Sequence, residues 1–131
     1  MIDPTGGAAA AGQHAANSVY DGGVARNIVS VRFASTALTA TVVAAAAGLK
    51  TKLLGVHVAF AAPATTGAFY FKDGGGTLLF VVHTIPVAVT VLTIAMSGYV
   101  ICETPVNSAL VAQFDGTGPN YNLQIQYYQA P

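Results

Sequence analysis

From Asn27 onward, the chain is built of short runs in which apolar and polar residues alternate, separated by glycine and proline. In residues 53–60 the large apolar side chains fall on one side of an extended chain and the small or polar ones on the other: Leu54, Val56, Val58 and Phe60 against Gly55, His57 and Ala59. A period of two is typical of a half-buried strand. About a quarter of the chain is Val, Ile or Thr, and β-branched side chains favour strands. We therefore predict an all-β fold.

Residues 27–131 contain eight or nine predicted strands with turn residues between them. They cover residues 28–33, 36–46, 53–60, 67–72, 77–82, 87–96, 99–103, 109–114 and 122–128. Short strands at a spacing of roughly 8 to 12 residues indicate a β-sandwich or barrel, and no βαβ unit is visible. Eight strands in two sheets is the jelly-roll number. We predict a single jelly-roll-like β-sandwich, with an immunoglobulin-like sandwich as the alternative.

Two segments bear on this assignment of strands and turns. The alanines at residues 44–47 also favour a helix, so a helix stays open for residues 36–46. Residues 73–76, Asp-Gly-Gly-Gly, supply the positive φ angles of a hairpin turn. The preceding Lys72 gives this turn a superficial likeness to a phosphate loop, but no helix follows whose N-terminus could hold an anion.

Residues 1–26 differ from the rest because they combine many glycines and an alanine run with few large apolar side chains. Such a segment cannot build a core, and its alanine run is too short for a stable helix. We predict an extended N-terminal arm over residues 1–26 and a sandwich domain over residues 27–131. The arm is either a disordered tail or a segment that orders on a neighbouring subunit through Ile2, Val19 and Tyr20.

Charged residues are scarce. They make up 8% of the chain, with five basic and five acidic side chains, against roughly 25% in an average domain. So few Lys and Arg cannot neutralise a run of phosphates, which argues against nucleic acid as a partner. Little like-charge repulsion would keep copies of the chain apart. We therefore expect a subunit of an assembly.

The sequence shows no sign of export or membrane insertion. The N-terminus lacks the basic and apolar regions of a secretory signal. The most apolar stretch, residues 81–96, is interrupted by His, Pro and Thr and falls short of the roughly 20 residues of a membrane helix. Cys102 is the single cysteine and cannot form an intramolecular disulfide. We expect a protein made in the cytoplasm, without a membrane partner.

The carboxylates do not form a catalytic pattern. An enzyme needs an acid or base near a nucleophile and a charge-binding group. Asp3 and Asp21 lie in the arm, and Asp73 and Asp115 each precede a glycine, where Asp commonly bonds its own turn. Glu103, at the end of a predicted strand, is expected on a solvated face.

The remaining reactive side chains are also scattered. His14, His57 and His83 show none of the spacings of a metal site. Cys102 lies in an alternating segment beside Val100 and Ile101, which predicts a buried, inert thiol. We expect no catalytic residue, no metal and no cofactor.

Tyrosines cluster toward the C-terminus and raise the question of sugar binding. Tyr99, Tyr121, Tyr127 and Tyr128 could form an aromatic platform, although tyrosine packs into β cores and interfaces as readily. With no tryptophan and few carboxylates, carbohydrate binding is the lesser expectation. The candidate partner-binding residues are therefore Ile2, Val19, Tyr20, Tyr99, Tyr121 and Tyr128.

Residues 43–54, an Ala/Val run followed by a Gly-Leu-Lys turn and a strand, resemble small structural proteins of tailed bacteriophages. The likeness continues through residues 69–74, Phe-Tyr-Phe-Lys-Asp-Gly, and through residues 98–113, ahead of a closing aromatic strand. The long Gly/Ala arm and the near absence of charge depart from this pattern.

The resemblance implies a head decoration, or cement, protein that carries no catalytic residues. It would be a β-sandwich that trimerises, is assembled in the host cytoplasm and sits on the outer surface of the capsid, bound to the major capsid protein. A trimer that bridges several shell subunits adds interface area, and three linked attachments raise avidity. The alternative is a tail or baseplate fibre module that binds host glycan through the tyrosines and is present in few copies.

Overall fold

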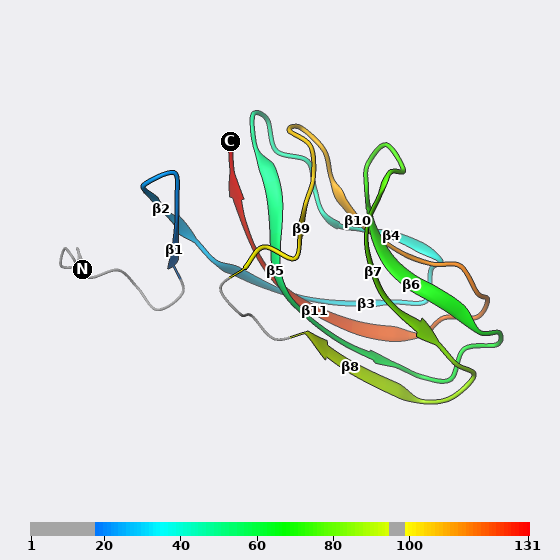
Figure 1. The fold of residues 1–131 in the computed structure, drawn as a ribbon. Helices are drawn as coiled ribbons and strands as arrows, with labels where there is room; N and C mark the ends of the chain where they lie inside the picture. Colours follow the sequence, from blue (N-terminus) through cyan, green and yellow to red (C-terminus); the bar gives the residue numbers. More distant parts are fainter. Residues whose placement is uncertain (1–17, 95–98) are drawn as a thin grey trace.

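The computed structural model describes residues 18–94 and 99–131. Two β-sheets pack together and a small hairpin lies beside them (Figure 1). The strands are β1 (Ser18–Asp21), β2 (Val24–Asn27), β3 (Val29–Ser35), β4 (Thr39–Val43), β5 (Lys50–Phe60), β6 (Gly67–Asp73), β7 (Leu78–Ile85), β8 (Thr90–Ile94), β9 (Cys102–Glu103), β10 (Leu110–Phe114) and β11 (Tyr121–Ala130).

The order of the strands identifies a jelly roll. One sheet runs β3-β11-β5-β8, with the short β9 also paired to β5, and the other runs β4-β10-β6-β7. Leaving aside the hairpin and β9, the first strand pairs with the last, the second with the seventh, the third with the sixth and the fourth with the fifth, all antiparallel. The chain is thus one long ribbon rolled into two sheets. The predicted β-sandwich is confirmed, and the strand order excludes the immunoglobulin-like alternative.

Alternating side chains from both sheets fill the space between them. Phe60 of β5 lies at the centre of an aromatic cluster, with its ring centroid 5.2 Å from Phe69, 5.4 Å from Phe114 and 5.0 Å from Tyr121. All four side chains are buried. Each such pair contributes about 0.5–1.5 kcal/mol beyond the burial of its area. Because two of the rings come from each sheet, the cluster locks the sheets together.

A β-bulge in β5 changes the face on which one predicted core residue lies. Gln126 pairs with Gly55, but Tyr127 pairs with Leu53, so Leu54 has no partner in the β11 register. Leu53 belongs to the main core, whereas Leu54 packs outside it against Tyr128. The prediction that Leu54 shares a face with Val56 is therefore wrong, because one extra residue reverses the alternation.

Residues 18–26, the described part of the predicted arm, form a hairpin instead of an extended segment. β1 and β2 pair from Ser18 with Asn27 to Asp21 with Val24. The two residues between them, Gly22 and Gly23, have φ angles of 61° and 77°. Two consecutive left-handed residues make a type I′ turn, which suits the twist of a two-residue hairpin. The rest of the predicted arm lies outside the described residues.

The carboxylate of Asp21 connects the hairpin to β5 and β11 of the sheet. Asp21 Oδ2 accepts hydrogen bonds from Lys52 Nζ at 2.6 Å and from Tyr128 Oη at 2.8 Å. The hydrogen bonds from Lys52 and Tyr128 lower the pKa of Asp21. Burial and the neighbouring carboxylate raise the pKa of Tyr128 to about 12. The hairpin therefore joins β5 and β11 through a charge-assisted contact as well as an apolar one.

Several strands are shorter than predicted. The strand predicted over residues 36–46 is β4, residues 39–43, and the alanines after it form neither helix nor strand. The strand predicted over residues 87–96 is β8, which begins at Thr90 and whose described end is Ile94. Of residues 99–103, two form β9. The Asp73 turn is confirmed, because its Oδ1 accepts hydrogen bonds from the backbone of Gly75 and Thr77.

Candidate functional site

Polar side chains line the outer face of the sheet that contains β3, β11, β5 and β8. The strand registers place Arg32 beside Gln124, Gln124 beside His57, and His57 beside Thr93, so these side chains form one row across four strands. Asn122 and Gln126 lie on the same face of β11, two residues to either side of Gln124, because side chains alternate along a strand. We call these side chains the polar face: Arg32, His57, Thr93, Asn122, Gln124 and Gln126.

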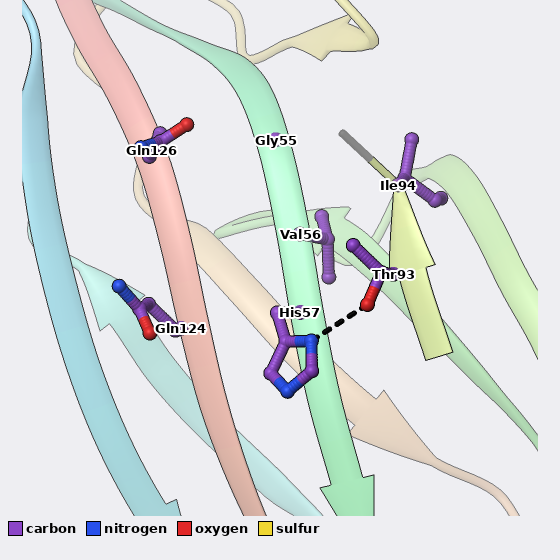
Figure 2. A pocket seen from close by; sticks show the side chains of 7 residues that line it. All are labelled: Gly55, Val56, His57, Thr93, Ile94, Gln124 and Gln126. Carbon is purple, nitrogen blue, oxygen red and sulfur yellow. Dashed lines mark hydrogen bonds between the residues drawn. The ribbon is translucent and has the colours of Figure 1, made fainter. Parts of the chain in front are cut away.

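The polar face is hollowed on both sides of its centre. One hollow, of about 180 Å³, is lined by Gly55, Val56, His57, Thr93, Ile94, Gln124 and Gln126 (Figure 2). A second, of about 510 Å³, is lined by Arg32, Phe33, Ala34, His57, Ala59, Asn122, Leu123 and Gln124. His57 and Gln124 border both hollows and separate them. The small residues of β3 and β5 leave room between the longer polar side chains.

His57 is held in one orientation. Its Nδ1 lies 2.7 Å from Thr93 Oγ1, a hydrogen bond across neighbouring strands (Figure 2). Since that nitrogen is engaged, Nε2 on the opposite side of the ring is the one left for a ligand. Gln124, beside His57 on β11, offers both an amide donor and a carbonyl acceptor to the two hollows. The row thus presents oriented hydrogen-bonding groups without a nucleophile.

The described carboxylates lie away from the polar face. Asp21 and Glu103 are paired with Lys52 and Lys50, and Asp73 lies in its turn. Asp115 was predicted to bond its own turn, but its Oδ1 accepts a hydrogen bond from the distant backbone of β6 at 2.6 Å. The polar face therefore carries the positive charge of Arg32 with no described carboxylate to balance it.

A second surface feature is a strip of exposed valines. Val87 and Val89 lie in the bend just before β8 and Val91 lies within β8, and they are 57%, 78% and 60% exposed. In the described part of the chain, no strand pairs with the outer edge of β8. A free edge strand with apolar, uncharged side chains is a surface that tends to bind another chain. We call these three residues the valine strip.

The three predicted anchors of the arm differ in where the structure places them. Ile2 lies outside the described residues. Val19 is half-buried and packs against the cluster of Leu54, Tyr128 and Ala130 on its own chain. Tyr20 is 55% exposed. The structure therefore brings Val19 and Tyr128 together within one subunit.

The predicted tyrosine platform is not formed. Tyr121 is buried in the aromatic cluster and Tyr128 lies beneath the hairpin, while Tyr99 is highly exposed. Tyr127 packs against the main core. Tyr121 and Tyr128 lie on opposite faces of β11 by ordinary strand alternation, so they cannot form one platform.

The other reactive groups are consistent with structural roles. Among the described residues, no three His, Cys, Asp or Glu side chains come close enough to bind a metal ion. Burial, with a smaller effect of Glu103, raises the pKa of the Cys102 thiol to about 12, so the thiol is not activated as a nucleophile. His83 bonds the carbonyl oxygen of Thr84 through Nδ1 at 2.5 Å. His14 lies outside the described residues.

The polar face was missed at the sequence level, although its signal is present. Asn122, Gln124 and Gln126 alternate with buried residues along β11, which predicts a polar surface. The sequence could not place Arg32 and His57 beside them, because β3, β5 and β11 are distant in the chain and their adjacency depends on the topology.

Comparison with protein-family models, curated proteins and solved structures found no match. In the part of the chain that the structure describes, no helix has the length and apolar character needed to cross a membrane.

Proposed function

We propose that this chain is a non-enzymatic capsid decoration protein that binds the outer surface of a bacteriophage head as a trimer. The observation that carries the proposal is the valine strip, which gives the jelly roll an uncharged surface suited to burial against another copy. The resemblance of residues 42–128 to small phage structural proteins is the reason for proposing a phage head as the structure to which the chain binds. The strand edge and the scarcity of charge support an assembly subunit over a free monomer.

In the proposed trimer, each valine strip is buried against a neighbouring copy. The rigid sandwich then holds three shell-binding surfaces at fixed spacing, so that the second and third attachments form at high effective concentration. Bridging of adjacent major capsid protein subunits stabilises the shell by adding interface area, with no chemical step.

The test uses expanded shells of the phage that encodes the chain, assembled without it. Purified protein is added, and the amount bound and the temperature of shell rupture are measured. We expect binding that saturates at a fixed ratio to the shell protein and a higher rupture temperature. Shells that bind none of the protein, or that rupture at the same temperature when saturated, would refute the proposal.

A further inference from the structure

We infer that the polar face is a binding site for a saccharide that carries a carboxylate group. This goes beyond the proposed function, because shell binding requires no ligand at this surface. It also differs from a tyrosine platform, since every side chain involved is an amide, an imidazole, a hydroxyl or a guanidinium.

The shape of the surface fits two linked rings. The two hollows adjoin, and the side chains of His57 and Gln124 stand between them. A disaccharide can place one ring in each hollow and its linkage over this central pair. Gly55 and Ala59 of β5 line the two hollows and carry little or no side chain, so the sugar rings can approach the backbone of the sheet.

The chemistry of the surface fits sugar hydroxyls and one negative charge. Amide side chains can donate and accept in the same place, as vicinal hydroxyls require. Arg32 lines the larger hollow, and its guanidinium can bind a carboxylate through two parallel hydrogen bonds. No described carboxylate is paired with Arg32, so its charge is available to a ligand.

The composition of the face argues against the other partners. The centre of a protein–protein interface is enriched in aromatic residues and methionine, and the six side chains of the polar face include none; Phe33, which borders the larger hollow, packs against the main core. Neutral sugars are commonly held by stacking on an aromatic ring, which this face also lacks. A charged group on the sugar is therefore needed to orient the ligand and to give useful affinity.

The experiment is a titration of the full-length, ¹⁵N-labelled protein, followed by NMR. The probes are 3′-sialyllactose and trigalacturonate, which carry carboxylates, and lactose, which does not. Arg32→Gln removes the guanidinium. Lys72→Gln, on β6 of the other sheet, removes a charge elsewhere and is the matched control. Thermal unfolding of each variant shows whether it folds.

We expect a carboxylated probe to shift the amide signals of β11 and β5 around Gln124 and His57, and lactose to bind at least about tenfold more weakly. Loss of a bidentate charge-assisted contact should make binding to Arg32→Gln about tenfold weaker or more, with Lys72→Gln unchanged. The inference is overturned if neither carboxylated probe shifts these signals, if lactose binds equally well, or if both variants weaken binding alike. Tetraglutamate binding in place of the saccharides would also overturn it and would assign the face to an acidic peptide.

Discussion

Replacing Val89 by aspartate tests whether the valine strip holds copies of the chain together. Val89 precedes β8 and is 78% exposed, so its side chain makes few contacts within the subunit. The Val89→Asp chain should therefore fold normally. In an interface, by contrast, the substitution removes an apolar contact and places a carboxylate in its position.

The size of the effect follows from the exposed fraction. Full burial of a valine side chain contributes about 1.5–3 kcal/mol, and covering the exposed part of Val89 would contribute about 1–2 kcal/mol of this at each interface. An unpaired carboxylate buried there adds a penalty of at least about 1 kcal/mol. A total of about 2–4 kcal/mol corresponds to association roughly 30- to 700-fold weaker.

Sedimentation equilibrium over a range of protein concentrations measures this effect. We expect wild type to be a trimer and Val89→Asp to dissociate at much higher concentration, with an unchanged circular dichroism spectrum. The matched control is Leu38→Asp, since Leu38 is 45% exposed but lies between β3 and β4, at the opposite edge of the sandwich. Equal dissociation constants for wild type and Val89→Asp, or equal weakening by Leu38→Asp, would refute the reasoning.

Three further predictions concern stability. Gly67→Ala would place a Cβ 2.2 Å from a backbone nitrogen of the loop after β10. Urea unfolding should show a fold destabilised by about 1–3 kcal/mol. The control Gly74→Ala, whose Cβ would have its nearest contact at 3.4 Å, should change stability far less. Tyr121→Phe should shift stability by less than about 1 kcal/mol, since the buried hydroxyl makes no hydrogen bond of standard geometry and only a weaker polar contact with Ser35; a loss well above that would show that the contact with Ser35 is a strong hydrogen bond. The contact of Asp21 with the sheet should stabilise the folded chain fully above the ordinary Asp pKa of 3.8, and this stabilisation should weaken as the pH falls through the lowered pKa of Asp21 in the folded state. The contribution of the Tyr128 hydroxyl should be complete below pH 10.0 and should be lost as the pH rises toward 12. The difference in melting temperature between wild type and Asp21→Asn should therefore vanish at low pH and shrink as the pH rises toward 12, and a constant difference would contradict this assignment.

The class of fold was predictable because the alternation of side chains is a local property. In β6 and β11, buried and less buried residues alternate along most of the strand as predicted. The Asp73 turn was predictable for the same reason, since four consecutive residues specify it. The jelly-roll strand order was not, because the nested pairing of β3 with β11 and β4 with β10 depends on contacts between segments far apart in the chain.

The errors also have local physical causes. Gly22 and Gly23 were read as signs of an extended arm, whereas adjacent glycines after an aspartate form a tight hairpin turn. Leu54 was assigned to the core because alternation alone cannot reveal the bulge that turns it outward. Tyr128 lies on the outer face of β11 by ordinary alternation, and the hairpin covers it there, which removes it from the predicted sugar platform.

The copy number of the protein in purified phage particles tests decoration of the head most directly. Quantitative mass spectrometry against the major capsid protein gives this ratio. Decoration predicts a copy number comparable to that of the shell protein, in multiples of three. A few copies per particle would contradict decoration and place the protein in the tail, and absence from the particle would contradict any structural role in the virion.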